Sequence, residues 1–312
     1  MKVLVTGGLG QIGSHVSEIC LERGDHVLCI DNLETGREEH LSAHPNLKIE
    51  LVSIADRPLM ENVFEDFKPD SVVHTAASYK NPNDWYSDTM TNCVGGANIV
   101  DLSVQHGVQR FVYFQTALCY GLKPDESPIP LSHPRRPEGS SYAISKTTNE
   151  LYLELSGLDF VTFRLANVVG PRNVAGPLPI FYQRLKDGKK CFVTEARRDF
   201  VYVGDLAKAV VRACDGVGSG TYHFSSGSDV AILELYEEVA RAMGFNETPD
   251  VDIIKLGEDD VFSILLDPKR TLADFGPIEF TPISTTVASA VDYYKKHGTL
   301  GEYTHLKMEN KK

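Results

Sequence analysis

The segment that decides the fold is Lys2-Val3-Leu4-Val5-Thr6-Gly7-Gly8-Leu9-Gly10-Gln11-Ile12-Gly13. Residues 2–5 form a short apolar, β-branched run that is typical of a strand, and residues 12–21 have the mixed pattern of a helix. Glycines at positions 7, 10 and 13 allow the backbone to approach a pyrophosphate, which then lies at the positive end of the helix. The segment therefore predicts a strand, a glycine turn and a helix that together bind a dinucleotide.

An acidic residue follows this unit at the position that a dinucleotide site requires. A second strand, residues 26–30, ends at Asp31, about twenty residues after the glycine turn. A carboxylate there can accept both hydroxyls of the adenosine ribose, and it repels a 2′-phosphate. The sequence therefore favours NAD over NADP, although Arg37 is close enough to weaken that preference slightly.

Strands and helices alternate through the first half of the chain. Strand-like segments occur at residues 47–52, 71–74, 111–114 and 160–164, and helical segments at 59–67, 90–106 and 142–155. This alternation predicts an α/β fold, namely a Rossmann-type doubly wound parallel sheet that is covered on both faces. Gly-Pro motifs interrupt the alternation after Asn167. We therefore predict a Rossmann domain that binds NAD over residues 1–167, with a return segment at about 199–228, and mainly a smaller C-terminal substrate-binding lobe over 168–312.

The composition excludes several classes of protein. The 31 basic and 43 acidic residues give a net charge of −12, so no basic surface for nucleic acid is expected. There is no run of about eighteen apolar residues that could span a membrane. The six cysteines and ten histidines are scattered, so we expect free thiols and no metal. The segment before the glycine turn is too short for a signal peptide, so the expected location is the cytoplasm.

A tyrosine and a lysine four residues apart are the best candidates for catalysis. Tyr142 and Lys146 would share one face of a helix. A tyrosine with the ordinary pKa of about 10 is a poor base at neutral pH, and a fixed positive neighbour lowers that value. The pair suits the removal of a proton from a sugar or steroid hydroxyl while hydride leaves the same carbon. Taken alone, the spacing is more typical of a surface helix, and its place downstream of the dinucleotide fold, after Ser140-Ser141, makes the pair the best candidate.

Together these motifs resemble the extended short-chain dehydrogenases/reductases, in particular the NAD-dependent nucleotide-sugar epimerases and dehydratases related to UDP-glucose 4-epimerase. The resemblance covers nearly the whole chain and is strongest over residues 1–198. It is carried by the glycine turn, Asp31-Asn32, His74-Thr75-Ala76-Ala77, Asn92, residues 115–121, Tyr142 with Lys146, residues 164–172 and Arg198-Asp199-Phe200-Val201.

The resemblance implies roles for individual residues. Thr116 would pass the substrate hydroxyl proton toward Tyr142, beside Lys146, and Asn92 would support their helix. The implied cofactor contacts are Gly7, Gly10, Gln11, Ile12, Gly13, Asp31, Asn32, Ser53, Ile54, Ala76, Ala77, Asn92, Tyr142 and Lys146. The implied substrate contacts are Ser78, Lys80, Thr116, Asn167, Phe192 and Arg198, with Phe181 as an alternative to Phe192 for stacking on the base. Family members commonly form homodimers through two helices, here 90–106 and 142–155.

Three departures from the family pattern limit what the resemblance implies. Ala117 and Leu118 stand where the 4,6-dehydratases have the Asp and Glu that expel water, which disfavours that reaction. Ser53 replaces an acidic residue expected near the adenine, with Asp56 as a possible substitute. The second arginine for the diphosphate is absent near residues 256–260. Either one of three other cations takes its role, namely Lys255, Lys269 or Arg270, or the phosphates of the substrate are held differently.

The resulting hypothesis is an NAD-dependent epimerase that inverts C4 of a nucleotide-diphosphate sugar, with a UDP-sugar expected, through a transient 4-keto intermediate. A reductase or dehydrogenase, a dehydratase or a decarboxylase on the same scaffold remains open. A non-catalytic, regulatory NAD-binding protein is the alternative of a different class. Sugar supply for surface polysaccharides or secondary metabolites is the corresponding context.

Overall fold

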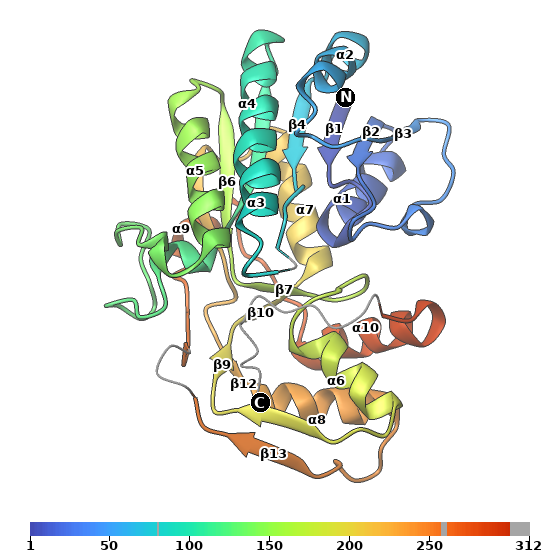
Figure 1. Cartoon of the computed structure of the whole chain (residues 1–312), viewed down its shortest axis with the longest axis vertical. Coiled ribbons are helices and arrows are strands. Elements are labelled where there is room, and N and C mark those ends of the chain that lie inside the picture. Colours follow the sequence, from blue (N-terminus) through green and yellow to red (C-terminus); the bar gives the residue numbers. More distant parts are fainter. Residues whose placement is uncertain (80, 257–260, 300–312) are drawn as a thin grey trace.

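A seven-stranded parallel sheet forms the centre of the structure, a computed structural model that describes residues 1–79, 81–256 and 261–299 (Figure 1). The strands lie in the order β11-β6-β5-β4-β1-β2-β3, so the chain reverses its direction of winding between β1 and β4. This arrangement confirms the predicted Rossmann-type fold. The strands are β1 (Lys2–Thr6), β2 (His26–Asp31), β3 (Leu47–Leu51), β4 (Ser71–His74), β5 (Arg110–Thr116), β6 (Phe160–Leu165) and β11 (Gly220–Phe224).

Helices cover both faces of this sheet, which explains why its central strands are continuous apolar runs. On one face α1 (Gln11–Glu22) and α7 (Val203–Cys214) bury Val16, Cys20, Leu206 and Val210 against the strands. On the other face α2 (Arg57–Phe67), α4 (Gly96–Gln105) and α5 (Ser141–Leu155) cover a second core (Figure 1).

The helical segment predicted at 90–106 is confirmed, and it has two parts. A π-helical segment η2 (Thr89–Gly95) continues into α4, and the short helix α3 (Trp85–Asp88) precedes both. The two glycines at the junction have close neighbours. A Cβ atom on Gly95 would lie 2.6 Å from the Ile54 side chain, and one on Gly96 would lie 2.4 Å from the Asn149 amide. These close approaches come from tertiary packing, which periodicity does not report.

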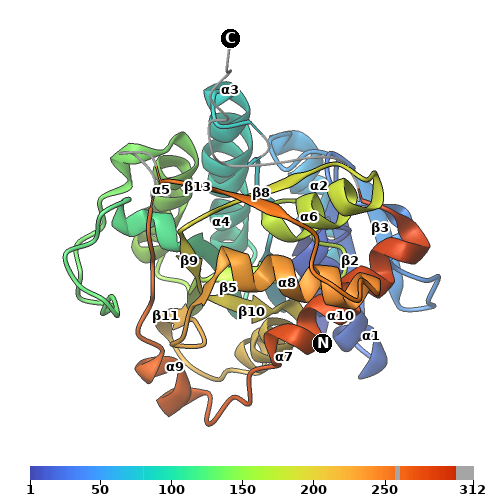
Figure 2. The same ribbon diagram turned by 90° about the horizontal axis from the view of Figure 1, so that it is seen from below.

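The lobe has its own core, formed by α6 (Pro177–Lys186), α8 (Ile232–Met243) and α10 (Ile283–His297) with the strand pair β8 (Cys191–Thr194) and β13 (Val251–Ile254). Figure 2 shows α8 beside both α6 and α10. The strands of the large sheet point toward this lobe (Figure 1). Smaller elements complete the described chain: η1 (Glu38–His40), η3 (Ala117–Tyr120), η4 (Pro137–Gly139), α9 (Lys269–Asp274), and the pairs β7 (Asn167–Val169) with β10 (Phe200–Tyr202) and β9 (Arg197–Arg198) with β12 (Val230–Ala231).

The chain returns from the lobe to the sheet, because α7 packs on α1 and β11 pairs with β6. Both α7 and β11 fall between residues 199 and 228, the range of the predicted return segment. The division into a Rossmann domain over 1–167 and a lobe over 168–312 remains a prediction about how the chain is organised into units.

A buried carboxylate fixes α5 to the sheet. Glu150 has no exposed surface, and it accepts hydrogen bonds from Arg164 Nε at 3.0 Å, Arg135 Nη1 at 3.2 Å and Gln115 Nε2 at 3.2 Å. Arg164 is also buried and donates to the Tyr120 hydroxyl at 2.5 Å. These bonds join α5 to β5, β6 and η3, so they determine how the helix is placed on the sheet.

Replacement of Glu150 by Ala should strongly destabilise the protein, because it leaves the Arg164 guanidinium buried without its carboxylate partner. We expect a loss of about 3–5 kcal/mol in the free energy of unfolding, measured by urea denaturation of the NAD-free protein. Glu154→Ala is the matched control, since Glu154 pairs with Arg135 at the surface and should cost less than about 1 kcal/mol. Equal losses for the two variants would contradict this role of Glu150.

Candidate active site

The candidate site lies at the edge where the carboxyl ends of the parallel strands meet. This edge faces the lobe, and the reversal of winding between β1 and β4 falls within it. Ligands of open α/β sheets bind in the crevice at such a point.

The glycine turn between β1 and α1 is closely packed. Gly7 has a φ of +66°, and a Cβ atom there would lie 2.7 Å from the Ala76 amide nitrogen. A Cβ atom on Gly13 would lie only 2.3 Å from the Gly7 carbonyl oxygen. Gly10 is the N-cap of α1 and places no side chain over the first turn of that helix. The amide groups at the start of α1 can therefore approach the oxygens of a pyrophosphate.

Two polar side chains beside this turn fit NAD as well. Gln11 Nε2 is buried and has no hydrogen-bond partner among the described residues. The Asp31 carboxylate, at the end of β2, accepts hydrogen bonds from Leu9 N at 3.0 Å and Leu33 N at 2.9 Å. Burial raises the pKa of Asp31, and the amide hydrogen bonds oppose that shift. Asn32 shapes the same loop by accepting a hydrogen bond from Glu34 N at 3.1 Å.

The other predicted cofactor contacts flank the turn on the β3 and β4 sides. Ile54 is buried against Gly95, whereas Ser53 is exposed and its hydroxyl accepts a hydrogen bond from Ala55 N at 3.2 Å. Asp56, the possible substitute for Ser53, caps α2 by accepting a hydrogen bond from Leu59 N at 3.2 Å. Ile12 lies in the first turn of α1. After β4, Ala76 N donates to Thr6 Oγ1 at 3.4 Å, and the half-buried Ala77 follows it.

Tyr142 and Lys146 lie one turn apart near the start of α5, where Ser140 caps the helix. Lys146 is 3% exposed, and its Nζ atom lies 4.3 Å from the centre of the Tyr113 ring. Burial lowers the pKa of Lys146 to about 7, and the Glu150 carboxylate opposes that shift.

Burial also acts on the phenol of Tyr142. It raises the pKa of Tyr142 above its ordinary value, and the neighbouring Tyr79 and Asp88 raise it further. Desolvation is the largest cause of this shift, and the lowering effect expected from Lys146 stays a prediction.

Asn92 connects α5 to the loop after β4. Its side-chain nitrogen donates to Ser145 Oγ and to Ser78 O, both at 3.0 Å, and its oxygen accepts from Ser78 N at 2.8 Å. Asn92 lies in the π-helical segment η2 and is buried. It therefore holds the buried Ser78 through its backbone and positions α5 at the same time.

Thr116 ends β5 and is half-buried. Its hydroxyl oxygen accepts a hydrogen bond from Leu118 N at 3.2 Å, which leaves its proton available to donate. Because η3 packs against α5, Thr116 and Tyr142 belong to the same edge of the sheet. The side chains of Ala117 and Leu118 in η3 carry no group that transfers protons.

The predicted diphosphate contacts lie on the short strands between sheet and lobe. Asn167 is exposed on β7, and its side-chain nitrogen donates to Asp199 O at 3.1 Å. Arg198, on β9, donates through Nη1 to three carbonyl oxygens, those of Arg197, Val261 and Phe262, at 2.7–3.1 Å. These backbone acceptors hold the guanidinium in one orientation at the junction of sheet and lobe.

The two aromatic residues predicted to stack on the nucleobase of the substrate have different environments. Phe192 is 45% exposed on β8 and remains a candidate. Phe181 is buried in the lobe core with its ring centre 5.3 Å from that of Tyr236, so the prediction for Phe181 was wrong. Helical periodicity does not distinguish a core aromatic from one that lines a site. Lys80 lies outside the described residues.

The structure separates the three cations that could replace the missing arginine. Arg270 donates to Ser219 O and Thr221 O at the amino end of β11, the edge opposite the site, so that candidate was wrong. Lys269 neighbours it on α9 and lies 3.3 Å from the Asp267 carboxylate. Lys255 is exposed directly after β13 and remains a candidate.

The sequence did not indicate the contacts that Arg172 makes with α1, the helix that follows the glycine turn. Arg172 donates to both carboxylate oxygens of Glu18 and to Ser14 Oγ on α1. It has a φ of +66°, which is rare for a residue other than glycine. Its place in Gly170-Pro171-Arg172-Asn173, the motif that interrupts the α/β pattern, was the available signal.

No helix in the described ranges is both long and apolar enough to cross a membrane. Among the same residues, no group of three or more His, Cys, Asp or Glu side chains could hold a metal ion.

Comparisons with known proteins identify the class. The model of the NAD dependent epimerase/dehydratase family matches residues 3–223. The chain is 30% identical over 313 residues to UDP-glucose 4-epimerase of Mycolicibacterium smegmatis, covering 95% of this chain and 99% of that protein. The structure is similar to that of the Bordetella bronchiseptica enzyme WbmH in complex with NAD+, with a TM-score of 0.94, 65% identity, and coverage of 96% of this chain and 99% of that chain. It is also similar to WbmG of the same organism in complex with NAD and UDP, with a TM-score of 0.89, 39% identity, and coverage of 97% and 98%.

The chain therefore belongs to the NAD dependent epimerase/dehydratase family. It is an enzyme of that family and its cofactor is NAD, which confirms the class and the cofactor that the sequence predicts. The Gly7–Gly13 cradle, Gln11 and Asp31 fit this cofactor. The roles of the individual site residues stay predictions.

Replacement of Lys146 by Met should change how stability depends on pH. Since the pKa of Lys146 is about 7 in the folded chain and about 10.4 when unfolded, the unfolded chain binds the extra proton between these values. The stability that Lys146 contributes is therefore lost as pH falls from about 10 through about 7. As pH rises through this window, the free energy of unfolding of the NAD-free wild type should increase relative to that of Lys146→Met. The increase should reach up to about 1.4 kcal/mol per pH unit, measured by urea denaturation.

Lys296→Met, at an exposed position of α10, is the control for removing a positive charge. A difference between wild type and Lys146→Met that stays constant from about pH 7 to about pH 10 would show that the folded chain does not depress this pKa.

Proposed function

We propose that the protein is an NAD-dependent epimerase that inverts C4 of a nucleotide-diphosphate sugar, with a UDP-sugar as substrate. The observation that carries the proposal is the pairing of Tyr142 with the buried Lys146 on the sheet edge that also bears Thr116. The adjoining Ala117 and Leu118 supply no acid or base to expel water. Such a site is suited to reversible oxidation of a hydroxyl without elimination.

In the proposed reaction Tyr142 takes the proton of the 4-hydroxyl through Thr116 and later returns it. A bound NAD would supply the acceptor for the hydride of C4 and then the donor of a hydride to the opposite face of the sugar. Lys146 provides positive charge near the phenol and holds the nicotinamide ribose. Because burial raises the pKa of Tyr142, we expect the phenolate to form only when the cationic nicotinamide ring is bound beside it.

The diphosphate would be the anchor, while the sugar remains free to turn over between the two hydride transfers. Asn167 and Arg198 lie between sheet and lobe, where they could hold the diphosphate, and the guanidinium of Arg198 suits a phosphate. The structure of WbmG with UDP and the relative described as UDP-glucose 4-epimerase support uracil as the base. A substrate of this class fits a cytoplasmic enzyme that supplies sugars for surface polysaccharides.

A panel of UDP-, dTDP- and GDP-sugars, incubated with the purified protein, tests the reaction. The proposal expects a product of unchanged mass and inverted C4 configuration, without net formation of reduced cofactor. Loss of water or carbon dioxide, or stoichiometric NADH, would assign a sister activity instead. No turnover of any sugar would favour the regulatory alternative.

Replacement of Tyr142 by Phe should nearly abolish turnover, by at least about 100-fold, because general acid–base groups contribute at this level. The variant should still bind NAD, which titration of the NAD-free protein measures. Tyr236→Phe is a suitable control, because Tyr236 is buried in the lobe core and its hydroxyl donates to Pro249 O at 2.9 Å. Activity of Tyr142→Phe within tenfold of wild type would remove Tyr142 from the role of base.

We also propose that the protein forms a homodimer through η2, α4 and α5, which lie side by side (Figure 1). Their outer surface carries exposed apolar side chains at helical spacing: Val94, Val104, Ile144, Leu151, Tyr152 and Leu155. Leu155 alone is 82% exposed. An apolar face of this kind is typical of a helical interface between subunits.

Replacement of Leu155 by Glu should convert the dimer into a monomer, or weaken it at least about tenfold, because a charge would be buried at the interface. Sedimentation velocity over a range of concentrations measures the change. Ile253→Glu on β13 is the control, since Ile253 is 61% exposed but lies in the lobe. A wild-type protein that sediments as a monomer would refute the dimer.

A further inference from the structure

The loop after β2 holds both polar backbone groups of Leu9, in the middle of the glycine turn. Leu9 N donates to Asp31, and Leu9 O accepts hydrogen bonds from His40 Nδ1 at 2.7 Å and Arg37 N at 3.2 Å. Since Nδ1 must carry a proton to donate to a carbonyl, Nε2 of the neutral imidazole is an acceptor. The shape of the turn therefore depends on the orientation and the tautomer of His40.

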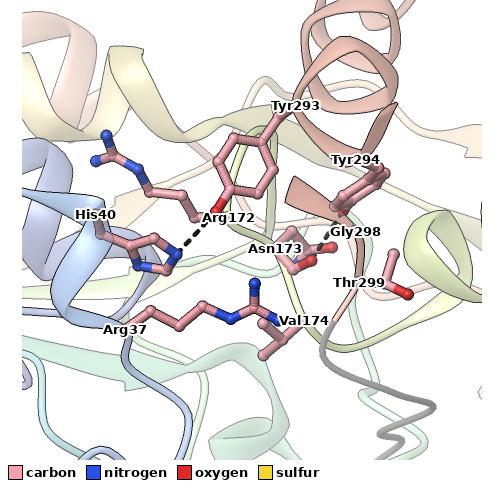
Figure 3. Close-up of a pocket in the computed structure, with 9 residues that line it drawn as sticks. All are labelled: Arg37, His40, Arg172, Asn173, Val174, Tyr293, Tyr294, Gly298 and Thr299. Atoms are coloured by element: carbon pink, nitrogen blue, oxygen red, sulfur yellow. Dashed lines mark hydrogen bonds between the residues drawn. The ribbon is translucent and has the colours of Figure 1, made fainter. Parts of the chain in front are cut away.

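Helix α10 of the lobe supplies the hydrogen-bond donor for His40 Nε2. Tyr293 on α10 donates its hydroxyl proton to His40 Nε2 at 2.9 Å, and the two rings meet edge to face (Figure 3). His40 is 4% exposed, and burial lowers its pKa, which favours the neutral form that this bond requires. A continuous chain of hydrogen bonds thus runs from α10 through His40 to Leu9.

The next residue of α10 supports the other side of the turn. The buried Tyr294 donates to Asn173 O at 2.8 Å (Figure 3), and Asn173 Nδ2 donates to Gln11 Oε1 at 3.3 Å. Arg37 Nη1 also donates to His297 O, at the end of α10, at 3.2 Å. Adjacent tyrosines therefore reach the residues on both sides of Gly10, the N-cap of α1.

We propose that Tyr293 and His40 are positioning residues that hold the glycine turn in its cofactor-binding shape, so that α10 controls how fast NAD leaves. The proposal rests on the proposed function, because an epimerase must keep the same cofactor molecule between the two hydride transfers. On this proposal, the turn has to open before the pyrophosphate can leave. The bond between Tyr293 and His40 opposes that opening from outside the Rossmann strands and helices.

The test replaces Tyr293 by Phe, which removes one hydroxyl and keeps the ring that stacks on His297 at 4.6 Å. Holoenzyme loaded with radiolabelled NAD is diluted into excess unlabelled NAD without sugar, and the retained label is followed over time. The variant should release NAD about five- to tenfold faster, which is the effect expected for one buried hydrogen bond. The melting temperature of the NAD-free protein should fall by only about 2–4 °C, the shift expected for the loss of one hydrogen bond.

Tyr236→Phe is the matched control, because Tyr236 is buried in the lobe and donates one hydrogen bond to Pro249 O at 2.9 Å. Its NAD release should equal that of wild type. In a His40→Phe background, Tyr293→Phe should cause no further acceleration, since the bond is already absent. If His40→Phe does not fold, the comparison of Tyr293→Phe with Tyr236→Phe decides alone.

Wild-type release of NAD by Tyr293→Phe, or equal acceleration in Tyr236→Phe, would overturn the proposal. Independent, additive effects of the His40 and Tyr293 substitutions would overturn it too. The assay contains no sugar, so it would still succeed with a protein that binds NAD without acting as an epimerase. Failure of the proposed function would appear only in the sugar panel.

Discussion

The site depends on one backbone contact, the approach of the first turn of α1 to the end of β1. At Gly13 this approach leaves no room for a Cβ atom beside the Gly7 carbonyl. Gly7 in turn lies against Ala76, so β1, α1 and the loop after β4 meet almost without intervening side chains. The amide groups of α1, the carboxylate of Asp31 and the loop that Asn92 holds are all placed relative to this contact.

Charge burial determines the second half of the site. Lys146, Glu150 and Arg164 are all nearly inaccessible to solvent, and they lie on two adjoining elements, α5 and β6. Each of these charges would be unfavourable alone, so their mutual arrangement restricts α5 to one position on the sheet. Burial lowers the pKa of Lys146, so its proton is held weakly, and the Glu150 carboxylate opposes that shift.

The features that could be predicted are those that the chain encodes locally. Apolar runs marked the buried strands, and the spacing of Gly7, Gly10 and Gly13 with Asp31 marked the cofactor site. The close approaches of Gly95 to Ile54 and of Gly96 to Asn149 could not be predicted, because they come from tertiary packing. Likewise, the pKa of Tyr142 depends on neighbours brought by other elements, and the partners His40 and Tyr293 are separated by 253 residues.

That separation has a consequence for how the protein is made. The ribosome synthesises the glycine turn early, whereas α10 is among the last described elements to emerge. Through most of translation the nascent Rossmann unit would therefore lack the support of Tyr293 and exchange NAD faster than the finished protein. Durable capture of the cofactor would coincide with the docking of α10, so it would report that the lobe has been completed.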